Sequence, residues 1–177
     1  MELGDVDRIT ADAIGEPGTR TFYLQARAGT QLVTVIVEKE QVQLLATSVL
    51  ELLSDIPLGT GAGPEDDEMA LEWPDDPRWR AGRLSIGYDT ELDRFVLELI
   101  EYRPELEDEE ADDPRSLLEG EAEVIVLRAT REQMFALSRY GAAVAERGRP
   151  ACPLCGNPMD PEGHVCPATN GHRTPRS

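Results

Sequence analysis

Two stretches of this chain show the same order of patterns, and this order limits the possible folds more than any other feature. Each stretch has three short strand-like runs followed by one helical pattern, and they cover residues 8–56 and 81–148. Runs of β-branched and aromatic residues between turn residues predict the strands. Apolar side chains every three or four positions then predict a helix with one buried face. We therefore expect an α+β protein whose helices pack on antiparallel sheet.

The predicted boundaries follow from turn residues and helix-start signals. Strands are expected at residues 8–14, 21–26, 31–37, 83–87, 94–100 and 122–128. The first helix is expected to run from Lys39 through Leu53. The second should begin after Thr130, which forms a capping-box pattern with Gln133, and end near Gly148.

Short matches between the stretches suggest that they are βββα pseudo-repeats. Ile14-Gly15 matches Ile86-Gly87, and Lys39-Glu40-Gln41 matches Arg131-Glu132-Gln133. The offset is 72 residues at the first strand (86 − 14) and 92 at the helix (132 − 40), and an acidic insertion before the last strand absorbs most of the difference. The shared order of elements is a stronger signal than these matches. Convergence stays open, because any two three-stranded meanders followed by a helix share such spacing.

The connecting loops carry two acidic blocks, at residues 65–68 and 105–113. Blocks of like charge are usually solvated and mobile, although they can also bind divalent cations or imitate a phosphate backbone. We expect solvated loops here. Trp73 and Trp79 flank a proline-rich part of the first loop and either pin it to the core or bind a partner. We expect them to pin the loop.

Charge and hydropathy exclude some classes of protein. The chain has 177 residues, with 17 Lys+Arg against 35 Asp+Glu, and its net charge is −18. Such an acidic chain repels nucleic acid. No apolar run reaches the roughly 20 residues that a membrane-spanning helix needs. The acidic start of the chain does not resemble a secretory signal, so we expect a cytoplasmic protein. The oligomeric state stays open.

The most specific chemical signal lies in residues 149–177, which we expect to form a tail after a body at residues 1–148. Cys152 and Cys155 are separated by two residues, and Cys166 follows eleven residues later (166 − 155). Three thiolates with one histidine fit a tetrahedral Zn²⁺ site. His164 is the preferred fourth ligand because it precedes Cys166 in a second knuckle-like turn, and His172 is the alternative. Zinc would also stabilise a segment with few aliphatic side chains.

Other uses of these cysteines fit less well. An odd cysteine count in a protein expected in a reducing compartment argues against a structural disulfide. A thioredoxin-like Cys-x-x-Cys opens a helix, whereas this one stands in a proline-rich tail. A deaminase-type zinc site needs His-x-Glu before the cysteines, and both histidines follow the first two. We therefore expect a closed, structural site and no catalytic residues.

The chain also resembles an uncharacterised actinobacterial family that is catalogued as a domain of unknown function and as a repeat protein. The resemblance rests on residues 15–26, residues 38–42, the Cys-Pro-Leu-Cys motif at 152–155, and Gly-His-Val-Cys-Pro at 163–167 with Asn170-Gly171. Members of that family tend to be encoded beside a histidine-phosphatase-like and a kinase-like protein. The resemblance agrees with a repeat and with a zinc-knuckle-like tail, and it implies no catalytic residue.

Two main functional hypotheses remain at this point. The first is a cytoplasmic binding or adaptor module stabilised by zinc, because the ligand set is closed and no nucleophile–base pair is evident. The alternative is an enzyme or enzyme subunit that acts on phosphorylated small molecules, which the gene neighbourhood and the almost exclusive use of arginine as the cationic residue favour. A third idea, an acidic mimic of DNA, is weakened by the arginines of the tail.

Overall fold

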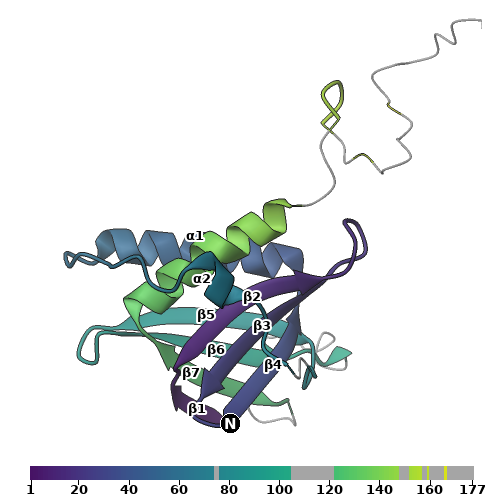
Figure 1. Ribbon diagram of the computed structural model, residues 1–177. Helices are drawn as coiled ribbons and strands as arrows, with labels where there is room; N and C mark the ends of the chain where they lie inside the picture. Colours follow the sequence, from purple (N-terminus) through teal and green to yellow (C-terminus); the bar gives the residue numbers. More distant parts are fainter. Residues whose placement is uncertain (74–75, 105–121, 148–151, 157–158, 160–165, 167–177) are drawn as a thin grey trace, which may run out of the picture.

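The computed structural model describes residues 1–73, 76–104, 122–147, 152–156, 159 and 166. Within them two sheets lie on the same side of two crossing α-helices (Figure 1). The elements in chain order are β1 (Glu2–Asp5), β2 (Arg8–Ile14), β3 (Thr21–Ala28), β4 (Gln31–Val37), α1 (Lys39–Asp55), the 3₁₀ helix η1 (Asp66–Met69), β5 (Ala81–Asp89), β6 (Arg94–Glu101), β7 (Val124–Ala129) and α2 (Arg131–Glu146). The predicted mixed α+β fold is confirmed.

Each sheet contains one of the predicted three-stranded meanders. One sheet has the order β2-β3-β4, and the other has the order β1-β7-β6-β5. Neighbouring strands are antiparallel except β1, which runs parallel to β7. Alternate side chains of the strands point toward the helices, and Ile9, Leu24, Val35, Leu97 and Leu127 are buried among the core residues.

The chain passes from one sheet to the other at two points. After β1 the amide of Val6 bonds to Arg128 of one sheet, and the amide of Asp7 bonds to Arg27 of the other. At the second point the segment before β5 runs beside β4, where the Ile36 amide donates to the Trp79 carbonyl at 2.9 Å. The last strand of each meander therefore has a parallel neighbour from a distant part of the chain.

Both helices begin with a capping box, which satisfies backbone N–H groups at the helix start. The third helical residue, Gln41 in α1 and Gln133 in α2, also reaches the other meander. Gln41 Nε2 donates to the carbonyls of residues 81–82 at 3.3 and 3.2 Å, and Gln133 Nε2 donates to those of residues 6–7, both at 3.0 Å. Each helix thus holds the chain where the first strand of the other meander begins.

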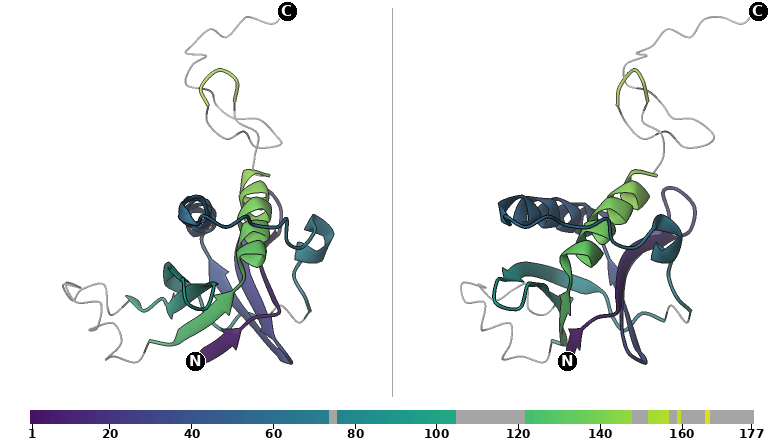
Figure 2. Two further views of the ribbon diagram at one scale, coloured as in Figure 1. Left: turned by 90° about the vertical axis from the view of Figure 1, so that its left-hand side faces the viewer. Right: turned by 60° about the vertical axis from the view of Figure 1, so that its left-hand side comes forward.

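The helices cross closely at a glycine. With α1 viewed end-on, α2 is seen from the side (Figure 2). A Cβ placed on Gly141 of α2 would lie 3.1 Å from Val42 Cγ1 of α1 and 3.4 Å from Ala11 Cβ of β2. A larger residue at this position would push the three elements apart. No helix among the described residues is long and apolar enough to cross a membrane.

A short strand precedes the first one predicted, because Glu2–Asp5 form β1 and bury Leu3. The four residues of the acidic block at 65–68 are exposed, in agreement with the expected solvated loop. The block forms most of η1, whose Met69 has no exposed surface. The block at 105–113 lies outside the described residues.

One expectation about the two tryptophans of the first loop is wrong. Trp79 does pin the loop, with 9% of its surface exposed and its indole N–H donating to Glu123 at 3.0 Å. Trp73 does not, because 80% of its surface is exposed. Trp79 lies beside β4 and has a carboxylate partner, whereas Trp73 has no such partner among the described residues.

Candidate metal centre

The first two predicted ligands lie on a tight turn that brings backbone N–H groups toward sulfur. Residues 153–155 form the turn, and the Gly156 amide closes it with a 2.8 Å hydrogen bond to the Cys152 carbonyl. Gly156 has φ +75°, a conformation that glycine adopts at little cost. The Leu154 amide lies 3.4 Å from Cys152 Sγ and donates to it. This geometry is typical of a metal-binding knuckle.

The third cysteine comes from the second predicted turn and joins the first two. The Sγ atoms of Cys152, Cys155 and Cys166 all lie within 4.8 Å of one another, and those of Cys152 and Cys166 are 3.8 Å apart. A disulfide would need about 2.05 Å, and all three cysteines are free. The three sulfur atoms could hold a metal ion. Among the described residues they form the one group with three such ligands.

The electrostatics of Cys152 favour its thiolate form, which is the form that binds metals. Hydrogen bonds from the backbone N–H groups of Leu154 and then Cys155 hold the pKa of the Cys152 thiol below its ordinary value. Burial opposes this effect, because it favours the neutral thiol. The hydrogen bonds outweigh burial, so the site is prepared for a cation.

Both candidates for the fourth ligand, His164 and His172, lie outside the described residues. The structure thus brings together three of the four ligands predicted from spacing. The nature of the metal and the choice of histidine stay predictions.

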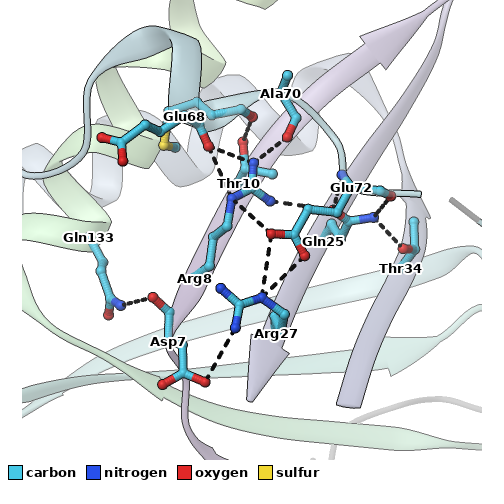
Figure 3. Close-up of polar contacts among 11 residues, drawn as sticks. Asp7, Arg8, Thr10, Gln25, Arg27, Thr34, Glu68, Ala70, Glu72 and Gln133 are labelled. Carbon is cyan, nitrogen blue, oxygen red and sulfur yellow. Dashed lines mark hydrogen bonds and ion pairs between the residues drawn. The ribbon is translucent and has the colours of Figure 1, made fainter. Parts of the chain in front are cut away.

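A second polar cluster, which sequence reasoning missed, lies where residues 57–72 cross the first sheet. We call these residues the strap. Arg8 and Arg27 both point toward the Glu72 carboxylate, and Gln25 bridges Glu72 and Thr34 (Figure 3). A polar cavity of about 320 Å³ beside the cluster is lined mainly by charged side chains.

The hydrogen bonds in this cluster show that it fastens the strap. The Arg8 guanidinium donates to the carbonyls of Glu68 and Ala70, and the Thr10 hydroxyl donates to that of Met69 (Figure 3). Arg8 already has carboxylate and carbonyl partners, and Arg27 has two carboxylate partners, so an anion would have to displace existing contacts to bind here. Alternating polar residues on a strand were the only signal for this cluster in the sequence.

Comparison with known proteins gives a family match. The family model described as "Protein of unknown function (DUF3090)" matches residues 1–166, which include the body and all three cysteines. Neither the search of curated proteins nor the search of solved structures found a match.

Proposed function

Because the chain belongs to the DUF3090 family of proteins of unknown function, we propose its role from its own geometry: a binding module whose C-terminal tail folds around a structural zinc ion. The observation that carries this proposal is the cluster of three cysteine sulfur atoms within 4.8 Å. We divide the chain into a body of two pseudo-repeats at residues 1–148 and the tail at residues 149–177.

Zinc is the metal that best suits this ligand set. Thiolates are soft ligands, and three of them with an imidazole complete a tetrahedral Zn²⁺ site. We assign His164 as the fourth ligand, because it stands two residues before Cys166 on the same turn, and we keep His172 as the alternative. Free thiolates need a reducing compartment, which supports a cytoplasmic location.

A filled coordination sphere favours a structural ion over a catalytic one. Catalytic zinc keeps one position open for water or substrate, whereas four protein ligands leave none. The two histidines of the chain are then both in the tail, one of them as a ligand. A binding role agrees with this use of the histidines, since neither is left in the body as a general base.

Metal analysis of the full-length protein tests the proposal. We expect one zinc per chain, and about 10–16 kcal/mol of apparent binding free energy holds such small sites together. Cys155→Ser should lose the metal and make the tail sensitive to protease, whereas the body should unfold as in the wild type. His164→Ala should weaken zinc binding more than its matched control His172→Ala.

Three results would reject parts of this proposal. If protein purified without chelator held no stoichiometric metal, the proposed zinc site would be rejected. If His172→Ala weakened zinc binding more than His164→Ala, His172 would be the fourth ligand instead of His164. Turnover of a phosphorylated metabolite by the wild-type protein would replace the binding role with an enzymatic one.

A further inference from the structure

A groove between α1 and β5 is a mainly apolar surface cavity of the body. Its volume is about 270 Å³, and Leu44, Leu45, Leu84 and Ile86 supply its apolar lining. Leu44 has 69% of its surface exposed. The groove is smaller than the roughly 300–1,000 Å³ of pockets for drug-sized molecules, so it fits side chains better than a free metabolite.

Gln41 and Gln133 make equivalent contacts at the starts of the two helices. Aligning these contacts pairs the elements around the groove with elements on the other side of the molecule. Gln41 corresponds to Gln133, and α1 therefore corresponds to α2 at an offset of 92 residues (133 − 41). Gln41 contacts the carbonyls of residues 81–82, just where β5 begins, and Gln133 contacts those of residues 6–7, just before β2. This aligns β5 with β2 at an offset of 75 residues (81 − 6). The groove between α1 and β5 thus corresponds to the contact between α2 and β2.

Where α2 contacts β2, which we call the α2–β2 corner, the strap covers the place that corresponds to the groove. A Cβ on Gly63 would lie 3.1 Å from the Cβ of Ala136, which is the counterpart of Leu44, so the strap backbone rests on the helix. The strap then passes β2 and buries Met69. Arg8 and Thr10 hold its carbonyl groups, as described above.

In the α1–β5 corner the same donors are present, but no described segment uses them. The counterparts of Arg8 and Thr10 are Arg83 and Ser85, which both line the groove. Neither side chain has a hydrogen-bond partner among the residues that the structure describes. β5 is also the outer strand of its sheet, with β6 as its one partner among the described strands. Such an unpaired edge can accept an extended chain.

We propose that the α1–β5 groove binds an extended segment of a partner protein, as the α2–β2 corner binds the strap. An aliphatic side chain of the partner contacts Leu44, Leu84 and Ile86, and its backbone carbonyls and a neighbouring carboxylate meet Arg83. Charge supports this choice, since Arg83 is the one charged side chain in the lining of the groove, in a chain with net charge −18. This surface deepens the proposed binding function but does not depend on the metal.

The test uses the strap sequence itself as a probe, because it is a segment that fits the corresponding corner. A synthetic peptide with the sequence of residues 61–72 is titrated to about 1 mM into the isotope-labelled full-length protein, a range that detects weak binding. We expect NMR shifts confined to residues 39–48 and 82–88. A peptide with aspartate in place of the methionine should not bind.

Matched variants of α1 locate the binding surface. Leu44→Asp should weaken binding by about tenfold or more. Leu50→Asp, at a leucine that is 47% exposed on the same helix and does not line the groove, should leave it unchanged. Both leucines are largely exposed, so both variants should fold. Cys155→Ser should bind the peptide as the wild type does, which separates this inference from the zinc site.

Four outcomes would overturn the proposal. Absence of binding at about 1 mM is the first. Shifts confined to α2 and β2 would mean that the peptide only displaces the strap. A smaller molecular mass of Leu44→Asp in solution would assign the groove to a second copy of the chain. Binding that appears only after deletion of residues 105–121 or 148–177 would assign it to a segment of the chain itself.

Discussion

At the corner where α2 crosses β2, the strap lies over the helix, passes the edge of the strand and buries Met69, whereas no described segment does this where α1 crosses β5. Both corners start from a capped helix whose third residue is a glutamine bonded to the other half. The two places therefore differ in the segment that covers them. The strap closes the one at α2 and β2, and none of the described residues covers the groove between α1 and β5.

The largest expected difference between the corners is at Met69. Met69→Ala should lower the free energy of unfolding by about 2–5 kcal/mol, because it removes a fully buried side chain and leaves a cavity under the strap. Leu44→Ala, in the open corner, should change it by less than about 0.5 kcal/mol. Urea denaturation of both variants measures this. Equal losses would mean that the α1–β5 corner is also covered.

The next comparison concerns glycines of the strap and of a free turn. Gly63 and Gly29 both have positive φ, so alanine should cost about 1–2 kcal/mol at either position. At Gly63 the new Cβ would also lie 2.2 Å from the Glu132 carbonyl, whereas nothing lies within 4 Å at Gly29. We expect about 1 kcal/mol or more in addition for Gly63→Ala in thermal unfolding. A smaller effect than for Gly29→Ala would show that the strap moves freely over α2.

The next test concerns Gln41 and Gln133, which fasten the starts of the two helices to the chain before β5 and β2. Gln133→Ala and Gln41→Ala should each cost about 1–2 kcal/mol, because each removes a capping interaction and two hydrogen bonds to the other half. Gln133→Ala should cost more, since its bonds to residues 6–7 are shorter. Gln43→Ala, at an exposed position of α1, is the control and should be nearly neutral. Chemical denaturation distinguishes the three variants.

Sequence patterns predicted the elements that bury a continuous apolar set. β4 has the predicted bounds, because its apolar run lies between clear turn residues. β1 could not be found in this way, since it is four residues long, carries two acidic residues and pairs with β7 at the far end of the body. Its signal in the sequence was limited to Leu3 and Val6, which are both buried.

The register of the first strands also needed three-dimensional contacts. Sequence matching pairs Ile86 with Ile14, whereas the glutamine contacts align it with Ala11 (86 − 75). Two short apolar strands match in several registers, and only the carbonyls that the glutamines contact select one of them. The strap was missed for a similar reason, because Arg8 holds its backbone carbonyls, which every residue has.

The cysteine cluster was more predictable than the strap. Thiolate spacing is a chemical signal that does not depend on how the body folds, and the proximity of Cys152, Cys155 and Cys166 is confirmed. The histidine could not be chosen from spacing alone, because His164 and His172 both stand within six residues of Cys166 in the sequence. This choice depends on backbone conformation between the ligands.

The smallest expected effect lies at the turn between β5 and β6, which is tied to α2, and it depends on pH. Asp93 accepts hydrogen bonds from Tyr88 and forms an ion pair with Arg131 at 2.9 Å. The Tyr88 hydroxyl first, and Arg131 after it, hold the pKa of the Asp93 carboxyl below its ordinary value. The carboxylate therefore stabilises the folded protein fully above pH about 4, and this contribution is lost as the pH falls further toward the folded-state pKa.

Unfolding experiments from pH 7 to acid should show this with Asp93→Asn. The variant should be slightly less stable than the wild type at pH 7. The difference should shrink below pH about 4, where the carboxyl takes up its proton first in the unfolded chain and, at lower pH, in the folded protein. Asparagine tolerates the positive φ of 53° at this position, so backbone strain should not add to the effect. Tyr88→Phe keeps the edge-to-face contact with Phe95 and removes only the hydroxyl that donates to Asp93, so it should lose part of the same pH dependence. A difference that stays constant in acid would mean that the ion pair at this turn does not stabilise the fold, and that α2 is held at the β5–β6 side by packing alone.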